Sequence, residues 1–339
     1  MLELQKRKME YMFIHTGQHL VKDLVKELDI RSPDFSIAKL ASKRGNFDSN
    51  SGALIWNLKL LFKIKKILNE LKPSVALVHG DTMTTTTATV AAKLVGIKVG
   101  HIEAGLRSGN IFEPWPEELS RRITDCLSNY LFAPTKEAAE RLHRINFFGR
   151  KQIVLTGNTN IDVLKENIKK IRRIKGRKYV FAKLHRQENI KSKLRMETFL
   201  KVISSIDAPV EFVIVENTRK KMEKYGLDSY LKNTKNIRLH NLLSYKEFLN
   251  MFANASLIIS DGGGEIEEAT YLHIPILSFR KYSERKEADK HGFGISTISF
   301  DKAVAYAKNV MNGTISSKGK CPFGDGTASE RIVNFLSKL

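Results

Sequence analysis

The sequence contains little cysteine and no long apolar run. It also lacks the pattern of a signal peptide, in which a charged segment is followed by an apolar one. Its two cysteines, Cys126 and Cys321, are too few and too far apart for a disulfide framework or a zinc site. No apolar run approaches the roughly 20 residues that span a bilayer. The charged N-terminus has no signal-peptide core. We therefore expect a soluble, cytoplasmic protein that binds no membrane.

Several short catalytic motifs are also missing. There is no GxGxxG loop followed by an acid, which argues against a nicotinamide cofactor. There is no HExxH or similar ligand spacing, so we expect no cofactor and no required metal. The run Thr84 to Thr87 lacks the His and acid partners of a nucleophile, and we expect it to start and cap a helix over Thr86–Leu94.

Positive charge is abundant instead. The chain has 57 Lys and Arg against 36 Asp and Glu, a formal net charge of +21, which attracts polyanions in general. The basic residues are spread over many expected helices, and no basic stripe interleaved with aromatic residues emerges. We expect solvated Lys-rich faces and no nucleic-acid partner. A nucleic-acid binder remains a hypothesis that rests on charge alone, and it would require a steep salt dependence.

Length and pattern together predict two domains. A chain of 339 residues exceeds the roughly 250–300 residues at which one core stops growing. Short apolar strands alternate with amphipathic helices, which is typical of an α/β protein with parallel, doubly wound sheets. The expected strands are 11–14, 75–78, 98–102, 130–133 and 152–155 in the first half, and 179–182, 211–215, 237–239, 257–260 and 275–279 in the second. We predict two Rossmann-like domains facing across a cleft, 1–164 and 165–327, separated near a charged run.

The first domain is expected to lack an element. A doubly wound sheet usually opens with a strand and a glycine-bearing phosphate loop, but this chain opens with a charged, helix-like segment before the strand at 11–14. Either the domain lacks its first strand, or the chain begins downstream of its original start.

Three carboxylates follow strands or a rigid turn in the first half. Asp81 follows the strand ending at Val78, and Glu103 follows the strand ending at Ile102. Glu117 comes directly after the rigid segment Pro114-Trp115-Pro116. Ligands of open α/β sheets bind beyond the carboxyl ends of the strands, so acids placed there suggest acid–base chemistry.

The second half contains a glycine loop between a strand and a helix. Gly262, Gly263 and Gly264 would let the backbone approach an anion such as a diphosphate at the helix N-terminus, although a tight turn explains the same pattern. Glu267 and Glu268 lie about one helical turn after the glycines, where they could accept hydrogen bonds from ribose hydroxyls. Glu265, in the first turn, would repel a phosphate unless its side chain points away.

Other polar residues also follow expected strands. His185, with Arg186 after it, is either a hydrogen-bonded structural residue or a partner in leaving-group or proton chemistry. The loops containing Gln18 and His19 after one strand, and Thr156 to Thr159 after another, are open to ligand contact or simple turn chemistry.

Taken in order, these blocks resemble the non-hydrolysing UDP-N-acetylglucosamine 2-epimerases over nearly the whole chain. The matching blocks are His79-Gly80-Asp81-Thr82, His101 to Arg107, Pro114 to Glu118, Thr156 to Thr159, His185 to Asn189, Ser260 to Gly264 with Glu267-Glu268, Ser283-Glu284-Arg285 and Gly324-Asp325-Gly326. The resemblance implies the B-type glycosyltransferase fold with an interdomain active site. It also implies a homodimer and a last helix, 328–339, that crosses back to the first domain.

The implied reaction is reversible C2 epimerisation of UDP-GlcNAc to UDP-ManNAc by elimination and re-addition of UDP through a glycal. By the resemblance, Asp81, Glu103 and Glu117 carry the proton chemistry and His185 stabilises the departing diphosphate. Glu268 matches the ribose-binding carboxylate and the glycine loop matches the phosphate loop. Within the matching blocks, Arg107, Arg186, Gly262, Gly263, Gly264 and Arg285 are further candidate substrate-binding residues. Gln18 and His19, in the loop after the first expected strand, are also candidate substrate-binding residues.

The chain also departs from the family pattern. It lacks the GTRPE-type loop that brings an arginine to the diphosphate, and Gly262 stands where the family commonly has Ser. Ile266 replaces the usual Gln, and Val215 to Thr218 replaces a segment with His and Arg. Two lost phosphate contacts could cost about 10²–10⁴ in rate. A non-catalytic or truncated nucleotide-sugar-binding homologue and a hydrolysing epimerase that releases ManNAc and UDP are therefore the alternatives.

Overall fold

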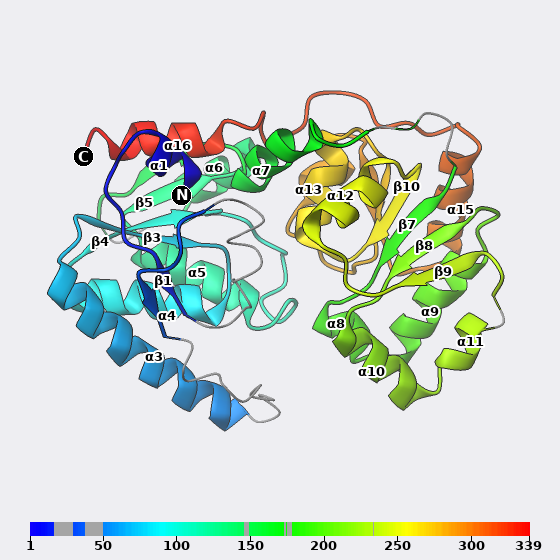
Figure 1. Ribbon diagram of the computed structural model, residues 1–339, viewed down its shortest axis with the longest axis horizontal. Helices are drawn as coiled ribbons and strands as arrows, with labels where there is room; N and C mark the ends of the chain where they lie inside the picture. The colour runs from blue at the N-terminus through cyan, green and yellow to red at the C-terminus, as the bar shows by residue number, and fades with distance from the viewer. Residues whose placement is uncertain (17–29, 38–49, 146–148, 173, 175–177, 233) are drawn as a thin grey trace. The chain divides into compact units, whose positions relative to one another are not determined.

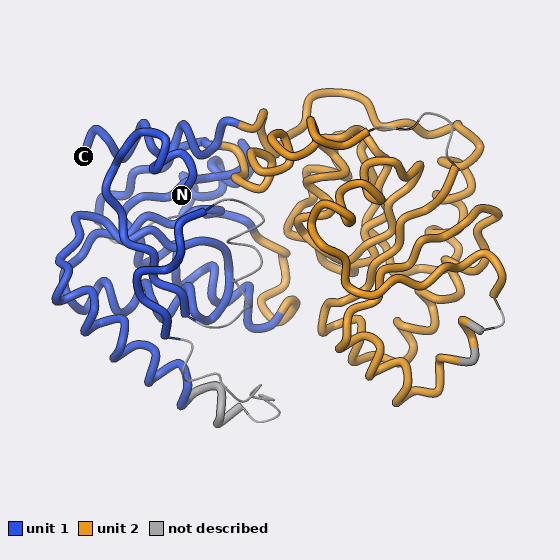
Figure 2. The backbone as a smooth tube through the Cα atoms, viewed as in Figure 1, with its two compact units in different colours: residues 1–106, 115–156, 327–339 blue, residues 107–114, 157–326 orange. Residues whose placement is uncertain are grey.

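The computed structural model describes the chain except residues 17–29, 38–49, 146–148, 173, 175–177 and 233. The chain forms two compact units, coloured separately in Figure 2. Unit 1 comprises Met1–Leu106, Trp115–Thr156 and Thr327–Leu339. Unit 2 comprises Arg107–Pro114 and Gly157–Gly326.

Unit 1 is built on a parallel four-stranded sheet of order β3-β4-β5-β6. Its strands are β3 (Val75–His79), β4 (Lys98–Ile102), β5 (Tyr130–Ala133) and β6 (Gln152–Leu155), and its main helices are α3 (Asn50–Leu71), α4 (Met83–Leu94), α5 (Glu117–Leu127) and α6 (Lys136–His143). Leu60 and Ile64 of α3 pack with Val99 of β4 in one core cluster. The four strands predicted over this region are confirmed, because each is a short apolar run followed by a polar turn.

The chain ends meet within unit 1. The helix α1 (Leu2–Lys6) lies beside α16 (Ala328–Leu336), where Arg7 Nη1 donates to Asn334 Oδ1 at 2.5 Å (Figure 1). Phe335 of α16 packs edge-on against Tyr130 and Phe132 of β5. The strand expected at 11–14 is shorter and later: β1 (Ile14–His15) pairs with β2 (Phe35–Ser36) in a separate two-stranded sheet.

Unit 2 contains a parallel six-stranded sheet of order β12-β11-β10-β7-β8-β9. Its strands are β7 (Val180–Lys183), β8 (Val210–Val213), β9 (Ile237–His240), β10 (Leu257–Ser260), β11 (Ile276–Ser278) and β12 (Gly294–Ser296). Its helices are α7 (Thr159–Ile168), α8 (Gln187–Ile190), α9 (Lys193–Ser204), α10 (Glu216–Tyr225), α11 (Asp228–Lys232), α12 (Tyr245–Ala253), α13 (Gly263–Tyr271), α14 (Lys286–Lys290) and α15 (Phe300–Met311). The strand β12 was not predicted from the sequence, because its three residues are too few and too polar to show a strand pattern.

Apolar side chains cover both faces of the unit 2 sheet. Along β7, Val180 and Ala182 belong to one core cluster and Phe181 to the other, as expected when successive side chains point to opposite faces. The near-continuous apolar runs of these strands are explained by this double burial.

The start of unit 2 differs from the boundary expected at 165. The helix α7 belongs to unit 2, since its Ile161 and Leu164 are buried in the same core cluster as Ile266 of α13. The segment Arg107–Pro114 also belongs to unit 2. Its Glu113 accepts from Arg195 Nη1 at 3.0 Å. Nothing in the sequence indicated that this segment of the first half belongs to unit 2.

Candidate functional site

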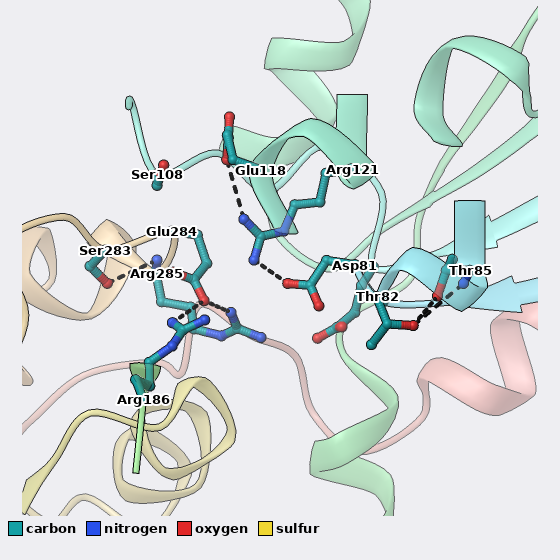
Figure 3. A network of polar contacts seen from close by, with 12 residues as sticks. Asp81, Thr82, Thr85, Ser108, Glu118, Arg121, Arg186, Ser283, Glu284 and Arg285 are labelled. Atoms are coloured by element: carbon teal, nitrogen blue, oxygen red, sulfur yellow. Dashed lines mark hydrogen bonds and ion pairs between the residues drawn. The ribbon is translucent and has the colours of Figure 1, made fainter. Parts of the chain in front are cut away.

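The loop after β3 places Asp81 beside α5. Gly80 adopts a φ of 74°, a left-handed conformation that favours glycine, and its N–H donates to Ile102 O of the neighbouring strand at 3.1 Å. The backbone thus turns at the strand end, and the next side chain is Asp81. Asp81 Oδ2 accepts from Nη2 of Arg121, which is buried on α5. Figure 3 shows Arg121 pointing to both Asp81 and Glu118.

Glu103 lies at the end of the adjacent strand β4. It adopts a φ of 70°, uncommon for a residue other than glycine. Its carboxylate lies 3.6 Å from His79 Nε2, and a Cβ added to Gly80 would lie 3.5 Å from Glu103 Oε2. Because β3 and β4 are neighbours with His79 opposite Ile102, the loops carrying Asp81 and Glu103 adjoin. The structure therefore brings these two predicted acids together.

Glu117 is the first residue of α5, and its side chain is partly buried. Its neighbour Glu118 is fully buried and is held by two arginines of the same helix. Arg121 Nη1 donates to Glu118 Oε2 at 3.2 Å, and Arg122 Nε donates to Glu118 Oε1 at 3.1 Å. Arg121 therefore links the loop of Asp81 to the helix that Glu117 begins.

A buried histidine–aspartate pair supports both loops. His101 Nδ1 lies 2.7 Å from Asp125 Oδ1, and its Nε2 lies 2.9 Å from Gly80 O. The second oxygen of Asp125 accepts from Gly105 N at 3.2 Å. Neither this pair nor Arg121 was predicted from the sequence. Each is buried on a helix or strand, and its sequence neighbours give no signal of this position.

The helix α4 begins earlier than expected. It starts at Met83, and the Thr82 hydroxyl caps it by accepting from Thr85 N at 3.4 Å. The prediction that Thr84 to Thr87 cap the helix is therefore wrong by about one turn. Those residues are buried inside α4 and bond to neighbours, as when Thr86 Oγ1 contacts Thr124 Oγ1 on α5 at 3.2 Å.

In unit 2, Asp261 organises the loop after β7. Its carboxylate accepts from His185 N at 3.0 Å, Arg186 N at 2.9 Å and Asn189 Nδ2 at 3.0 Å. His185 Nδ1 lies 2.9 Å from Asp261 Oδ1. The imidazole is thus held on one side, and its side chain remains about one-third exposed.

Asp261 is ionised despite its burial. Burial alone would raise its pKa, but the positive charge of a protonated His185, the Asn189 amide and the Arg186 N–H together hold the pKa of Asp261 well below its usual range. A buried negative charge therefore lies directly beside His185.

Three arginines surround Glu284. Its carboxylate accepts from Arg186 Nη1 at 3.4 Å, Arg280 Nη1 at 2.5 Å and Arg285 Nη1 at 2.6 Å. Figure 3 shows Arg186 and Arg285 both pointing toward Glu284. Arg285 Nε also donates to Glu267 Oε1 at 2.7 Å. Arg280 was not predicted from the sequence, where its only signal was a basic residue two positions after the buried strand β11.

The glycine loop leads into a helix as predicted from the sequence, and α13 begins at Gly263, inside the glycine run. Gly262 is the N-cap residue. At Gly263 a Cβ would lie 2.7 Å from Arg285 Cζ, so glycine is required for the arginine to approach the loop. Glu265 does not point freely at the helix N-terminus, since its Oε1 accepts from Lys183 Nζ.

Glu267 and Glu268, in the middle of α13, are both buried. Burial, followed by the negative charges of Glu265 and Glu267, raises the pKa of Glu268 well above its usual value. A carboxyl that retains its proton can both donate and accept hydrogen bonds, which suits a hydroxyl partner.

The predicted site residues thus fall into two groups. Asp81, Glu103 and Glu117 lie in unit 1, whereas Arg107, His185, Arg186, the three loop glycines, Glu268 and Arg285 lie in unit 2. Arg107 is buried. Gln18 and His19 lie outside the described residues.

Metal-ligand clusters and membrane-spanning helices are both missing from the described residues. There, no group of three or more His, Cys, Asp or Glu side chains is arranged to hold a metal ion. In that same part of the chain, every helix is too short or too polar to cross a membrane.

Comparison with curated proteins gives full-length relatives. The chain is 33% identical over 353 residues to the UDP-N-acetylglucosamine 2-epimerase of Methanocaldococcus jannaschii, covering 98% of this chain and 93% of the relative. It is also 33% identical over 350 residues to the protein of that name from Campylobacter jejuni, covering 95% of this chain and 88% of the relative.

Solved structures share the fold. The Methanocaldococcus jannaschii UDP-GlcNAc 2-epimerase, in complex with UDP-GlcNAc and UDP, superposes with a TM-score of 0.85 at 31% identity, over 99% of this chain and 94% of that one. The Acinetobacter baumannii MurG structure has a TM-score of 0.57 at 13% identity, over 100% of this chain and 94% of that one, and shows the glycosyltransferase-like fold alone. The family described as UDP-N-acetylglucosamine 2-epimerase matches residues 2–337, and the chain belongs to that family.

Proposed function

We propose that the chain catalyses the reversible C2 epimerisation of UDP-GlcNAc to UDP-ManNAc by elimination and re-addition of UDP. One observation carries the proposal: two partly exposed carboxylates, Asp81 and Glu103, lie at the ends of neighbouring parallel strands in a chain of this family. Acids so placed are available to a ligand beyond the strand ends.

The chemistry requires two proton transfers on opposite faces of the sugar. The C2 proton has no neighbouring carbonyl to acidify it, so direct exchange is unfavourable. When the C1–O bond breaks, its electron pair leaves with UDP, and a base takes the C2 proton as the C1–C2 double bond of the glycal forms. Return of a proton to C2 from the other face, and attack of UDP on C1, give the epimer. Asp81, Glu103 and Glu117 are the proposed proton carriers.

The unit 2 residues are proposed to bind the nucleotide diphosphate. His185 would stabilise the leaving diphosphate, because Asp261 holds its ring on one side while about one-third of its side chain remains exposed. Arg186, Arg285 and the loop from Gly262 to Gly264 would contact phosphate oxygens. Glu268 would bind a ribose hydroxyl. Arg107, Gln18 and His19 complete the proposed substrate contacts.

The decisive test is isotope exchange. The pure chain is incubated with UDP-GlcNAc in deuterium oxide, and the sugar is followed by NMR and mass spectrometry. We expect deuterium at C2 and a mixture of intact UDP-GlcNAc and UDP-ManNAc. Free ManNAc together with UDP would identify hydrolysis instead. Absence of label after long incubation would refute the epimerase.

A nucleotide-sugar-binding protein without turnover is the second candidate. It is favoured by the internal pairing of the arginines: Arg186 and Arg285 already contact Glu284, so their charge is partly committed before any diphosphate arrives. Calorimetry that detects UDP binding by a chain showing no deuterium exchange would support this candidate.

We also propose that the chain is a homodimer. On α3, three apolar residues recur at helical spacing and are each more than half exposed: Ile55, Leu58 and Phe62. They lie on the face of the helix opposite the buried Leu60 and Ile64. A second copy could cover this apolar stripe. Light scattering after size exclusion should report twice the chain mass, and Phe62→Glu should reduce it to that of one chain.

A further inference from the structure

A largely buried ion pair adjoins the glycine loop. Lys183 is the last residue of β7, and Glu265 lies in the first turn of α13. Lys183 Nζ lies 2.5 Å from Glu265 Oε1, with 19% of the lysine side chain and 9% of the glutamate side chain exposed. The ammonium also lies 5.5 Å from the ring centroid of Phe248. Two charges so enclosed have few alternative partners.

The pair explains why glycine stands at position 262. A Cβ built on Gly262 would lie 1.6 Å from Glu265 Oε2, a distance that no real side chain could occupy. The Glu265 carboxylate thus fills the space beside the loop that a serine side chain would need. Lys183, Glu265 and Gly262 therefore form one interdependent set, and the loss of a hydroxyl at 262 follows from the presence of the carboxylate.

Both members of the pair are charged. Burial alone would raise the pKa of Glu265, but the Lys183 ammonium and a protonated His185 lower it to about 2. Burial alone would lower the pKa of Lys183, but the negative charge of Glu265 raises it above its usual value. Without the lysine, a bare carboxylate would lie at the helix N-terminus, where a ligand anion is expected to bind.

We propose that Lys183 is a positioning residue for the nucleotide-sugar diphosphate and acts through Glu265: it neutralises and holds that carboxylate, so that the glycine loop can accept phosphate. The proposal rests on the proposed function, because it concerns the same loop and the same ligand. It differs from a direct lysine–phosphate contact in one respect. If Lys183 acts through Glu265, removing the glutamate charge makes the lysine dispensable.

A double-mutant cycle separates the two roles. UDP binding is measured by calorimetry for the wild-type chain, Lys183→Met, Glu265→Gln and the double variant. We expect Lys183→Met to weaken UDP binding about tenfold to a hundredfold, as for loss of a charge-assisted contact. Glu265→Gln should bind UDP at least as tightly as the wild type. The double variant should bind within about threefold of the wild type.

Lys220→Met is the matched control, because Lys220 forms an exposed ion pair with Glu216 on α10 and should leave UDP affinity unchanged. Lys183→Arg, which keeps the charge, should retain most of the affinity. If Lys183→Met weakens UDP binding by the same factor in the wild-type chain and in the Glu265→Gln variant, the proposal is overturned.

The test does not depend on whether the Lys183→Met variant folds. Should Lys183→Met fail to fold, the double variant buries neither charge, and its loss of UDP binding would itself overturn the proposal. The two proposals also fail differently. A wild-type chain that does not bind UDP would overturn both. A chain that binds UDP and exchanges deuterium, but shows an additive cycle, would overturn only the role of Lys183.

Discussion

The carboxylates of the two units differ in burial and in the number of their partners. In unit 1, the Asp81 and Glu103 side chains are 27% and 15% exposed. In unit 2, the Asp261 and Glu284 side chains are at most 1% exposed, and each accepts from three or more groups. A carboxylate enclosed by several donors is held in its ionised form and cannot exchange a proton readily. The comparison supports the proposal that unit 2 positions the ligand and that unit 1 carries out proton transfer.

The two strand–loop–helix turns differ in a related way. At β3–α4, the Thr82 side chain caps the helix. At β10–α13, Gly262 has no side chain to do so, and the first turn instead carries Glu265 paired with Lys183. The N-terminus of α4 is capped by the side chain of its N-cap residue, whereas the N-terminus of α13 has no side-chain cap and lies beside an ion pair. Only the second arrangement suits an anionic ligand.

The largest expected effect separates two adjacent acids on α5. Glu117→Gln should lower C2 deuterium exchange at least about 100-fold, because the proposed proton carrier is lost. Its melting temperature should stay close to that of the wild type. Glu118→Gln should instead destabilise the protein by about 3 kcal/mol, because the buried Arg121 loses a charged partner.

Exchange assays and thermal melting on both variants check this contrast. Full activity of Glu117→Gln would contradict its role. Equal destabilisation by the two substitutions would contradict the distinction between the partly buried acid and the buried one.

Asp261→Asn is expected to have the next largest effect, now in unit 2. The neutral amide would replace an ionised group that holds the loop of His185 and Arg186, at a cost of about 3 kcal/mol in the free energy of unfolding. Asp81→Asn should cost only about 1 kcal/mol, because Asp81 is partly exposed and Arg121 keeps Glu118. Denaturant unfolding of both variants measures the difference. A larger loss for Asp81→Asn would reverse the comparison.

Much of the fold could be predicted from the sequence because apolar runs in parallel sheets are short and continuous. The strands β4, β5 and β6 begin and end at the predicted residues. The strand β12 has no such run, and the membership of Arg107–Pro114 in unit 2 depends on contacts between residues far apart in the chain, such as Glu113 with Arg195. Local pattern contains neither kind of information.

Candidate site residues that directly follow strand ends could be predicted from the sequence. The buried residues that hydrogen-bond to them or to their loops could not. Asp81 and Glu103 stood out because each follows a predicted strand. Asp125 and Arg280 did not, because a polar residue buried against a loop carries no periodic signal. The role of Glu265 depended on the direction of its side chain, and sequence alone could not tell that Lys183 would meet it.

A pH-dependent difference is expected at Glu268. Its folded pKa is raised above the usual 4.5, so its contribution to stability is complete below about pH 4.5 and is lost as pH rises through the folded pKa. Glu268→Gln cannot ionise. Its free energy of unfolding relative to wild type should therefore increase with pH, by about 1.4 kcal/mol for each pH step of one between the unfolded and the folded pKa.

Melting of the wild-type chain and Glu268→Gln from about pH 4 to about pH 8 tests this expectation. A difference that stays constant over this range would show that Glu268 titrates alike in the folded and unfolded chains.

A smaller loss is expected from Gly262→Ser, which tests the difference between the two helix starts. Serine is a favourable N-cap residue, yet its Cβ would overlap the Glu265 carboxylate, so we expect destabilisation of about 1–3 kcal/mol. In a chain that carries both Lys183→Met and Glu265→Ala, and so buries neither charge of the pair, adding Gly262→Ser should cost much less. Thermal melting of these variants provides the measurement, and a stabilised Gly262→Ser single variant would contradict the geometry.

The smallest effect is expected at the other helix start. Thr82→Ala removes the hydroxyl that accepts from Thr85 N, and should cost about 1 kcal/mol in the free energy of unfolding. Thr82→Ser keeps a hydroxyl on Cβ and should stay within a few tenths of a kcal/mol of the wild type. Denaturant unfolding of the two variants resolves this difference. Because Thr82 directly follows Asp81, Thr82→Ala should also slow deuterium exchange slightly, whereas Thr82→Ser should not. If both variants unfold like the wild type, the α4 N-terminus does not depend on its cap, and the proposed difference between the two helix starts does not hold.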